Sequence, residues 1–207
     1  MAILPRDFYN GDTVAIARNL LGKILVRRYE GQNLALRITE TEAYVGRCDK
    51  ACHAYGYRKT ARNATMFGPP GHAYIYLIYG MHHCLNLVTE REGEPSAVLI
   101  RGGEPVLGTP AMARLRYGTA SEALTAYQRK HFGDGPGKLC KALALTRAED
   151  GTDLTGGTLW VTDDPADLGL ALPQETRPIA AAKRIGIDYA EEAKDFLWRF
   201  TYEEHAK

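Results

Sequence analysis

The sequence has no stretch of the roughly 20 uninterrupted apolar residues that a helix needs to cross a bilayer, so we expect no membrane span. Cysteines are few: Cys48, Cys52, Cys84 and Cys140 are too irregularly spaced for a disulfide framework, which fits a reducing compartment. The opening residues, MAILPRDFYN, lack the apolar centre of a secretory signal. We therefore expect an intracellular protein.

Internal repeats, low-complexity segments and linkers are also missing. Of the 207 residues, 45% are hydrophobic and 25% are charged, which leaves enough apolar surface to fold and excludes a disordered chain. The length suits one ordinary globular domain. We predict a single domain over residues 1–207.

Net charge is nearly absent as well, at +1, which by itself argues against a polyanionic partner. The charges are unevenly distributed, however. Residues 1–148 carry 20 basic and 12 acidic side chains, whereas residues 149–207 carry 6 and 13. The 40 residues from Lys50 to Thr89 contain no acid, and they hold four of the six histidines and five of the twelve tyrosines. Cations interleaved with aromatic rings suit a nucleic-acid surface, although chance and a structural core explain the pattern equally well.

Turn and cap residues divide the chain into short helices and strands. Helices are predicted at 13–21 (capped by Asp12), 111–117 (capped by Thr109), 122–132 (capped by Ser121), 139–145 and 189–196. Strands are predicted at 23–29, 34–44, 72–80, 82–88, 97–101 and 159–161. Because strands and helices do not alternate regularly, we predict an α+β fold with a curved, largely antiparallel sheet, flanking helices and a protruding β-hairpin.

Two carboxylates continue an apolar row in the second predicted strand. By alternation, one face carries Leu34, Leu36, Ile38, Glu40, Glu42 and Tyr44. Ionised carboxylates are costly to bury unless they are paired or near water, so this strand end is expected to open into a cleft. The residues do not distinguish which of the two glutamates acts there.

Tyrosines alternate along the hairpin that follows. Tyr74 and Tyr76 fall on one face, and Tyr79 is placed beside Gly80 at the tip, where its ring projects outward. Asn86 interrupts the apolar run CLNLV, and it either satisfies a neighbouring backbone group or contacts a ligand edge.

Two familiar site types fit poorly. Cys48, Cys52 and His53 could join the run 82–84 (His-His-Cys) around zinc, but the spacing matches no structural zinc motif, so we expect no metal. The run 135–138 (Gly-Pro-Gly-Lys) lacks the spacing of a P-loop. It suits either one phosphate, including one of a DNA backbone, or a simple helix start with an exposed lysine.

Several segments together resemble one family. They are ETEAYVG (40–46), AYGYRKTARNATMF (54–67), GHAYIYLIYGMHHCLN (71–86), AVLIRGGEP (97–105) and GPGKLCKALAL (135–145). In this order they closely resemble the alkyladenine (3-methyladenine) DNA glycosylase family. The resemblance implies a monomeric, monofunctional base-excision enzyme without metal or redox cofactor, acting on double-stranded DNA that contains damaged purines.

The resemblance also implies roles around a flipped-out nucleotide. Glu42 matches the general base that activates water. Arg101 matches an arginine near that water, although an ion pair with Glu40 or Glu42 is equally open. The aromatic pocket for the base is matched by Tyr44, His53 and Tyr76.

Further matches concern selectivity and the duplex. Asn86 matches the position that discriminates against guanine, and Tyr79 matches the wedge that enters the minor groove. Backbone or hairpin contacts are matched by Arg58, Thr60, Met81 and Lys138. His82 stands where relatives often carry another aromatic residue, so it is expected to alter the shape of the wedge.

Gly102 and Gly103 replace bulkier residues and are expected to loosen the pocket wall, while 184–187 (Arg-Ile-Gly-Ile) fits the pocket edge. The acidic last third is expected to lie mostly on the face turned away from DNA. The alternatives are a non-catalytic nucleic-acid-binding module, which needs no Glu42, and a nucleoside hydrolase, which needs no tyrosine hairpin.

Overall fold

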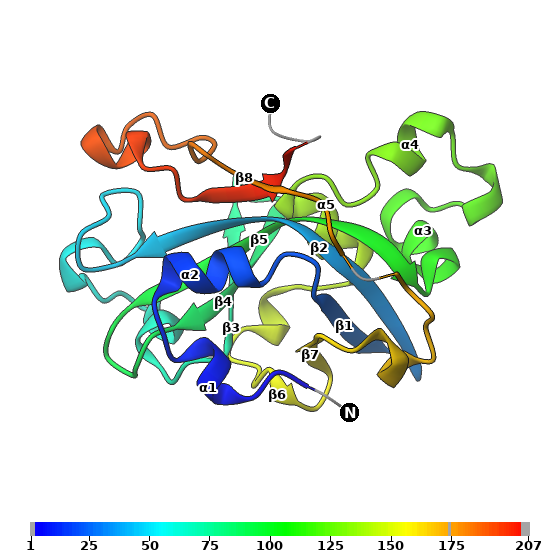
Figure 1. Cartoon of the computed structure of the whole chain (residues 1–207), viewed down its shortest axis with the longest axis horizontal. Coiled ribbons are helices and arrows are strands. Elements are labelled where there is room, and N and C mark those ends of the chain that lie inside the picture. The colour runs from blue at the N-terminus through cyan, green and yellow to red at the C-terminus, as the bar shows by residue number, and fades with distance from the viewer. Residues whose placement is uncertain (1–2, 174, 204–207) are drawn as a thin grey trace.

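One long strand organises the molecule. In the computed structural model, which describes residues 3–173 and 175–203, β2 (Gln32–Val45) pairs with β5 along one edge, and with β1 and then β9 along the other (Figure 1). The described residues form a nine-stranded, antiparallel sheet of order β3-β4-β5-β2-β1-β7-β6, to which the β8–β9 hairpin is added through β2. The other strands are β1 (Ile24–Tyr29), β3 (Ala73–Ile78), β4 (His82–Thr89), β5 (Ser96–Leu107), β6 (Thr155–Gly156), β7 (Leu159–Thr162), β8 (Ile179–Ala182) and β9 (Arg199–Tyr202). The predicted α+β class with a curved antiparallel sheet is confirmed.

Short helices flank this sheet. The α-helices are α1 (Arg6–Tyr9), α2 (Thr13–Asn19), α3 (Thr109–Tyr117), α4 (Ala126–Lys130) and α5 (Pro136–Ala142). Single 3-10 turns are η1 (Tyr55–Tyr57), η2 (Ala64–Phe67), η3 (Ser121–Ala123), η4 (Arg147–Glu149), η5 (Pro165–Leu168) and η6 (Glu191–Asp195). The Asp12 cap of α2 is confirmed, since its carboxylate accepts a hydrogen bond from the Ala15 amide at 2.8 Å.

Three helix predictions need correction. A single helix after Ser121 is wrong: η3 ends before Thr125, which starts α4 with a capping box completed by Gln128. Thr109 is the first residue of α3, and Gly108 precedes it in a left-handed conformation. Over 189–196 only η6 forms. In the first two cases a local signal marks the true boundary, namely the capping box at Thr125 and the left-handed Gly108. No side-chain cap is present at the start of η6.

A pair of β-bulges changes which face of β2 is buried in the main core. The register of β2 against β5 shifts twice around Glu40, so the alternation of side chains reverses there. Leu36 and Ile38 lie in the largest apolar cluster, and beyond the bulge Ala43 takes that place. The prediction of one continuous face through Glu42 is therefore wrong. The bulge turns the carboxylate away from the main core and toward a second cluster.

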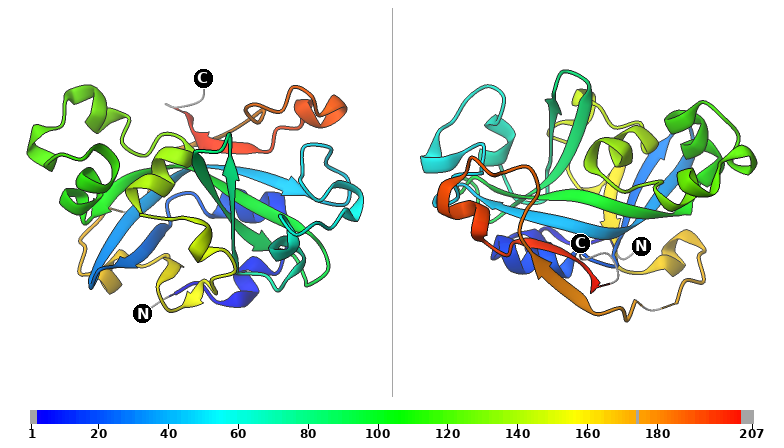
Figure 2. Two further views of the ribbon diagram at one scale, coloured as in Figure 1. Left: turned by 180° about the vertical axis from the view of Figure 1, so that it is seen from behind. Right: turned by 90° about the horizontal axis from the view of Figure 1, so that it is seen from above.

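Loop residues close the free edge of β3, the first strand of the sheet. The Asp150 carboxylate accepts hydrogen bonds from the Ile75 amide at 2.8 Å and from the Thr65 hydroxyl at 3.0 Å. Backbone bonds between Ala73 and residues 151–152 complete the cover. Beyond this covered part, the β3–β4 hairpin projects from the body, as the view from above in Figure 2 shows. The predicted protruding hairpin is confirmed.

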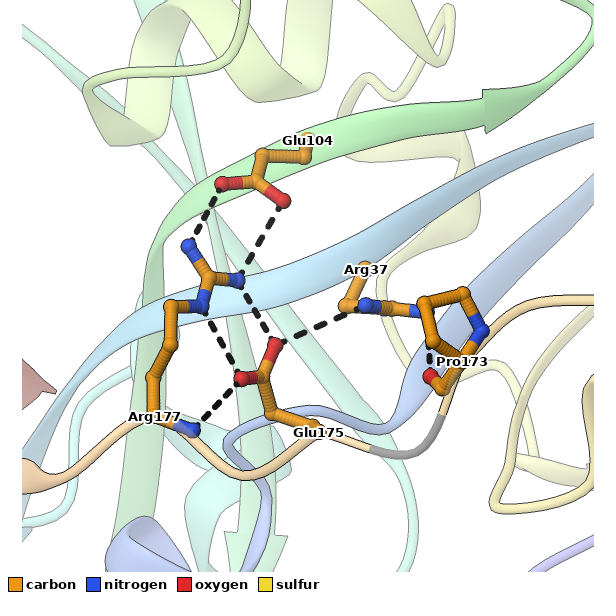
Figure 3. A network of polar contacts seen from close by, with 5 residues as sticks. All are labelled: Arg37, Glu104, Pro173, Glu175 and Arg177. Carbon is orange, nitrogen blue, oxygen red and sulfur yellow. Dashed lines mark hydrogen bonds and ion pairs between the residues drawn. The ribbon is translucent and has the colours of Figure 1, made fainter.

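An ionic network fastens the long segment that connects β7 to β8. Figure 3 shows Arg177 between Glu104 of β5 and Glu175, while Arg37 of β2 reaches Glu175 and the Pro173 carbonyl. Hydrogen bonds from Arg177, with Arg37 nearby, lower the pKa of Glu175 to about 2. The segment is thus held against the middle of the sheet by charge as well as by packing.

Within the described ranges, 3–173 and 175–203, we find no helix of the length and apolarity required to span a membrane. Cys48 is exposed, and Cys52, Cys84 and Cys140 are buried free thiols. The expectation that the cysteines form no disulfide framework agrees with these free thiols.

Candidate active site

A cavity of about 140 Å³ opens beside the β3–β4 hairpin. Its floor and walls come from β2, β3, β4 and β5, from the loop that carries His53, and from the segment that follows β8. Six of the predicted site residues line it together, namely Glu42, Tyr44, His53, Tyr76, Asn86 and Arg101. The cleft predicted at the end of the second strand is confirmed, although the bulge rather than simple alternation creates it.

Glu42 lies at the floor with no solvent-exposed surface. Its Oε2 accepts a hydrogen bond from the Tyr44 hydroxyl at 2.7 Å, and its Oε1 accepts one from the Ile185 backbone amide at 2.8 Å. Burial raises the pKa of Glu42, while Arg101 and these two donors oppose the rise. A carboxylate in this setting is a stronger base than an ordinary surface glutamate.

Arg101 joins two carboxylates. Its Nε lies 3.1 Å from Oε1 of Glu40 and 3.5 Å from Oε1 of Glu42. Glu40 also accepts a hydrogen bond from Nη1 of Arg199 at 3.0 Å. The alternative that sequence left open is therefore answered: Arg101 is an ion-pair partner of both glutamates, and it also lines the cavity.

Aromatic rings form the walls. His53 packs edge-on against Tyr76 with ring centroids 4.6 Å apart, and its Nδ1 lies 3.0 Å from the Tyr74 hydroxyl. Desolvation by neighbouring atoms, together with the charge of Arg62, lowers the pKa of His53, so the neutral imidazole is favoured. Tyr44 faces the cavity from β2. The rings are arranged as an apolar slot with polar ends.

Asn86 is nearly buried, and its side-chain nitrogen donates to the Tyr74 carbonyl at 3.1 Å. The backbone role left open from sequence is thus present. Because the nitrogen faces a carbonyl, the amide oxygen must face elsewhere, and the residue still lines the cavity. One conformation of Asn86 therefore allows both the backbone hydrogen bond and a contact with a ligand in the cavity.

The segment after β8 closes the far wall, in agreement with the prediction for 184–187. Arg184 is fully buried and forms a two-pronged ion pair with the equally buried Asp49. Its guanidinium also donates to the Ala43 and Ala193 carbonyls and lies 4.7 Å from the centre of the Tyr44 ring. Asp49 and Tyr74 were not predicted as site residues. Strand alternation placed Tyr74 beside Tyr76, but nothing in the sequence pairs residues 49 and 184.

The hairpin tip stands in solvent next to this cavity. Tyr79 is 83% exposed and Met81 is 69% exposed, and both Tyr79 and Gly80 have left-handed backbone angles that make the turn tight. His82 begins β4 and packs against Gly137 of α5, where an added Cβ would lie 3.0 Å from the His82 Cβ. The base of the hairpin is therefore supported from one side by α5.

The four residues matched to backbone or hairpin contacts lie outside the cavity, and one of them, Met81, stands at the hairpin tip. Arg58 and Thr60 are exposed on the loop beyond His53, and the Thr60 hydroxyl and amide are bonded to the Asn63 carboxamide. Lys138 extends from α5 but its Nζ lies 2.7 Å from Asp134. Its charge is therefore partly balanced within the protein.

Gly102 and Gly103 do not line the cavity and are closely packed, so the expectation that they loosen its wall is wrong. An added Cβ at Gly103 would lie 3.0 Å from the Leu36 Cβ. The loop at 133–135 docks on this strand: the Gly103 amide donates to the Gly133 carbonyl at 3.1 Å, and the Gly135 amide donates to the Arg101 carbonyl at 2.9 Å. Small residues are needed for this close approach.

Part of the last third borders the cavity, but the residues that do so are not acidic. Ile187 and Tyr189 line the opening, and Glu191 and Glu192 pair with Lys50 at 2.6 and 2.9 Å. The placement of the acidic residues on the face turned away from DNA stays a prediction. Across residues 3–173 and 175–203, no group of three or more histidine, cysteine or acidic side chains is arranged to hold a metal ion.

Comparison with known proteins settles the family. The sequence profile described as methylpurine-DNA glycosylase (MPG) matches residues 7–206. The chain belongs to the methylpurine-DNA glycosylase family. Similar proteins, each named "Putative 3-methyladenine DNA glycosylase", come from Clostridium perfringens strain 13 (50% identity, covering 95% of this chain and 94% of the relative) and Methanocella arvoryzae (52% identity, 97% and 92%). Another from Desulfitobacterium hafniense is 48% identical and covers 99% of this chain.

Membership in the methylpurine-DNA glycosylase family confirms the resemblance seen in the sequence segments. The chain is a monofunctional N-glycosylase, a hydrolase whose substrate is DNA. The cavity and its glutamate are the part of the fold suited to this chemistry.

Proposed function

We propose that this enzyme releases 3-methyladenine and other alkylated purines from duplex DNA in base excision repair, and that it also accepts hypoxanthine and ethenoadenine. The observation that carries the proposal is the position of Glu42. A buried carboxylate of raised pKa stands at the floor of an aromatic slot, next to an exposed hairpin tip. A binding module for polyanions has no use for such a carboxylate, because its charge opposes binding.

In this proposal Glu42 is the general base. With the nucleotide rotated out of the stack, Glu42 takes a proton from a water as the water oxygen attacks the anomeric carbon of the sugar. The electron pair of the N-glycosidic bond goes to the purine, so that a cationic alkylated purine leaves as a neutral base. A neutral purine leaves as an anion that takes a proton from water, and in both cases an abasic site remains. Arg101 helps to hold the water and keeps Glu42 ionised. The donors from Tyr44 and Ile185 fix the two carboxylate oxygens, so the base needs no rearrangement during the reaction.

The walls of the slot select the base. Electron-rich rings of Tyr44, Tyr76 and His53 favour a cationic alkylated purine through cation–π attraction. Asn86, whose nitrogen is held by backbone, presents a fixed amide that leaves no room for the extra amino group of guanine. Neutral lesions depend on stacking alone, so they are weaker substrates.

The exposed residues engage the duplex. Tyr79 fills the gap left by the flipped nucleotide from the minor groove, and Met81 and His82 flank it. Phosphate contacts are proposed for Arg58, Thr60 and Lys138. Lys138 must leave Asp134, or share its charge with it, on binding. We further propose that residues 1–207 act as one domain, as a monomer and inside the cell, where the substrate is.

The test uses duplexes that carry one hypoxanthine or ethenoadenine, together with methylated DNA, followed by alkali to cut abasic sites. We expect cleavage only at the lesion and only after alkali. Strand cleavage without alkali would contradict a monofunctional enzyme. If all three substrates stayed intact, the proposed function would fail, and hydrolysis of free nucleosides would be the alternative to measure.

A further inference from the structure

Glu40 lies next to Glu42 and Arg101 but does not line the cavity proposed to hold the substrate. It is absent from the lining of the substrate cavity, but it shares Arg101 with Glu42. The contact of Arg101 Nε to Glu40, at 3.1 Å, is shorter than the contact to Glu42, at 3.5 Å. The Arg101 guanidinium therefore pairs with both carboxylates, and it lies closer to Glu40 than to Glu42, the proposed base.

Resting on the proposed function, we propose that Glu40 is a positioning residue that sets the basicity of Glu42 by holding Arg101 away from it. Glu40 and Glu42 are two residues apart on β2, on the same side of the strand, hence about 7 Å apart along it. At such a separation, the negative charges of the fully buried Glu42 and the largely buried Glu40 disfavour each other's ionisation. Glu40 thus reduces the stabilisation that Arg101 gives to the ionised form of Glu42, and Glu42 remains a stronger base for that reason.

The other charged and titratable groups around Glu42 do not replace this effect. From the surrounding elements they are Tyr44 on β2, Cys84 on β4, Arg101 on β5, Arg184 after β8 and Arg199 on β9. Arg184 is neutralised by Asp49, and Arg199 contacts Glu40. In contrast to these groups, Glu40 carries a negative charge that disfavours ionisation of Glu42, and it also binds Arg101, which favours that ionisation.

The substitution Glu40→Gln isolates the charge. Glutamine keeps an acceptor oxygen for Arg101 and Arg199, so the hydrogen bonds and the packing persist. The acid limb of single-turnover base release should move to lower pH by on the order of one pH unit. The rate above that limb should fall, because a weaker base takes a proton less readily. Glu104→Gln is the matched control: Glu104 also lies on the sheet and pairs with an arginine, Arg177, but it contacts neither Arg101 nor Glu42 in an ion pair and does not line the cavity, so its profile should match the wild type.

A second measurement does not depend on activity. Carbon-13 labelling of glutamate carboxyl groups allows the ionisation of Glu42 to be followed by NMR, with its signal assigned by its loss in Glu42→Gln. We expect its midpoint to fall in Glu40→Gln and to stay in Glu104→Gln. An unchanged or raised midpoint in a folded Glu40→Gln protein overturns the role of Glu40. A wild-type protein that releases no base at any pH would instead overturn the proposed function, whatever the NMR midpoints.

Discussion

The buried ion pair between Asp49 and Arg184 gives the sharpest prediction about stability. Both side chains are fully shielded from solvent, and Arg184 makes two further hydrogen bonds to carbonyls. Asp49→Ala removes the partner and leaves a buried guanidinium charge uncompensated. Such a change costs about 3–5 kcal/mol, because the desolvation penalty of the remaining charge is no longer offset.

The assay is urea unfolding at pH 7, with Asp195→Ala as the control. Asp195 pairs with Lys183 in a contact of similar length, but their side chains are 55% and 63% exposed, so its loss should cost less than about 1 kcal/mol. For a urea slope of about 2 kcal/mol per molar, Asp49→Ala should lower the midpoint by about 2 M. Adding Arg184→Met to Asp49→Ala should restore part of the loss, since the unpaired charge is then gone. Equal midpoints for the two aspartate variants would refute the reasoning.

Three further predictions follow from other parts of the molecule. Gly133→Ala should destabilise the fold by about 1–3 kcal/mol, because the added Cβ would collide with the Gly103 carbonyl oxygen. Gly156→Ala is the control, since the space around Gly156 is open and its stability should not change. Equal melting temperatures of the two variants in thermal unfolding would contradict the close packing of Gly133 on Gly103. Glu175→Gln should have a lower free energy of unfolding than the wild type at neutral pH. This difference in free energy should shrink as pH falls from 4.5 toward 2, because a carboxylate with a lowered pKa stabilises the fold only while it is ionised. A difference that stays constant over this pH range in denaturant titrations would contradict the ionic role of Glu175. Tyr79→Ala should slow base release from duplex DNA much more than base release from a single strand. Tyr127→Ala also removes an exposed ring and should change neither rate.

The sequence predicts the parts of the site that depend on strand alternation and local turns. Tyr74 and Tyr76 share one face as expected, and Tyr79 stands at the hairpin tip. Glu42 was correctly placed in a cleft, but for an incomplete reason. A bulge depends on how two strands pair, and no single strand's pattern of residues records it.

Contacts between distant segments account for most of what was missed. The Ile185 amide that holds Glu42 comes from 143 positions further along the chain, and backbone amides leave no trace in residue identity. The docking of residues 133–135 on the strand at Gly103 is likewise set by the tertiary fold, so the sequence does not show that Gly102 and Gly103 permit a close backbone contact outside the cavity. Charge tallied by segment also does not show that Ile187 and Tyr189, from the acidic last third, line the cavity.

The central claim is that Glu42 performs general base catalysis in the release of a purine from DNA. Single-turnover excision from a lesion-bearing duplex by wild type and Glu42→Gln, with duplex binding measured on the same samples, tests it most directly. Glutamine keeps an oxygen that can accept the hydrogen bond from the Ile185 amide, so we expect Glu42→Gln to bind the duplex as the wild type does. Its rate of base release should fall by about 100-fold or more. Base release by Glu42→Gln at the wild-type rate would contradict it.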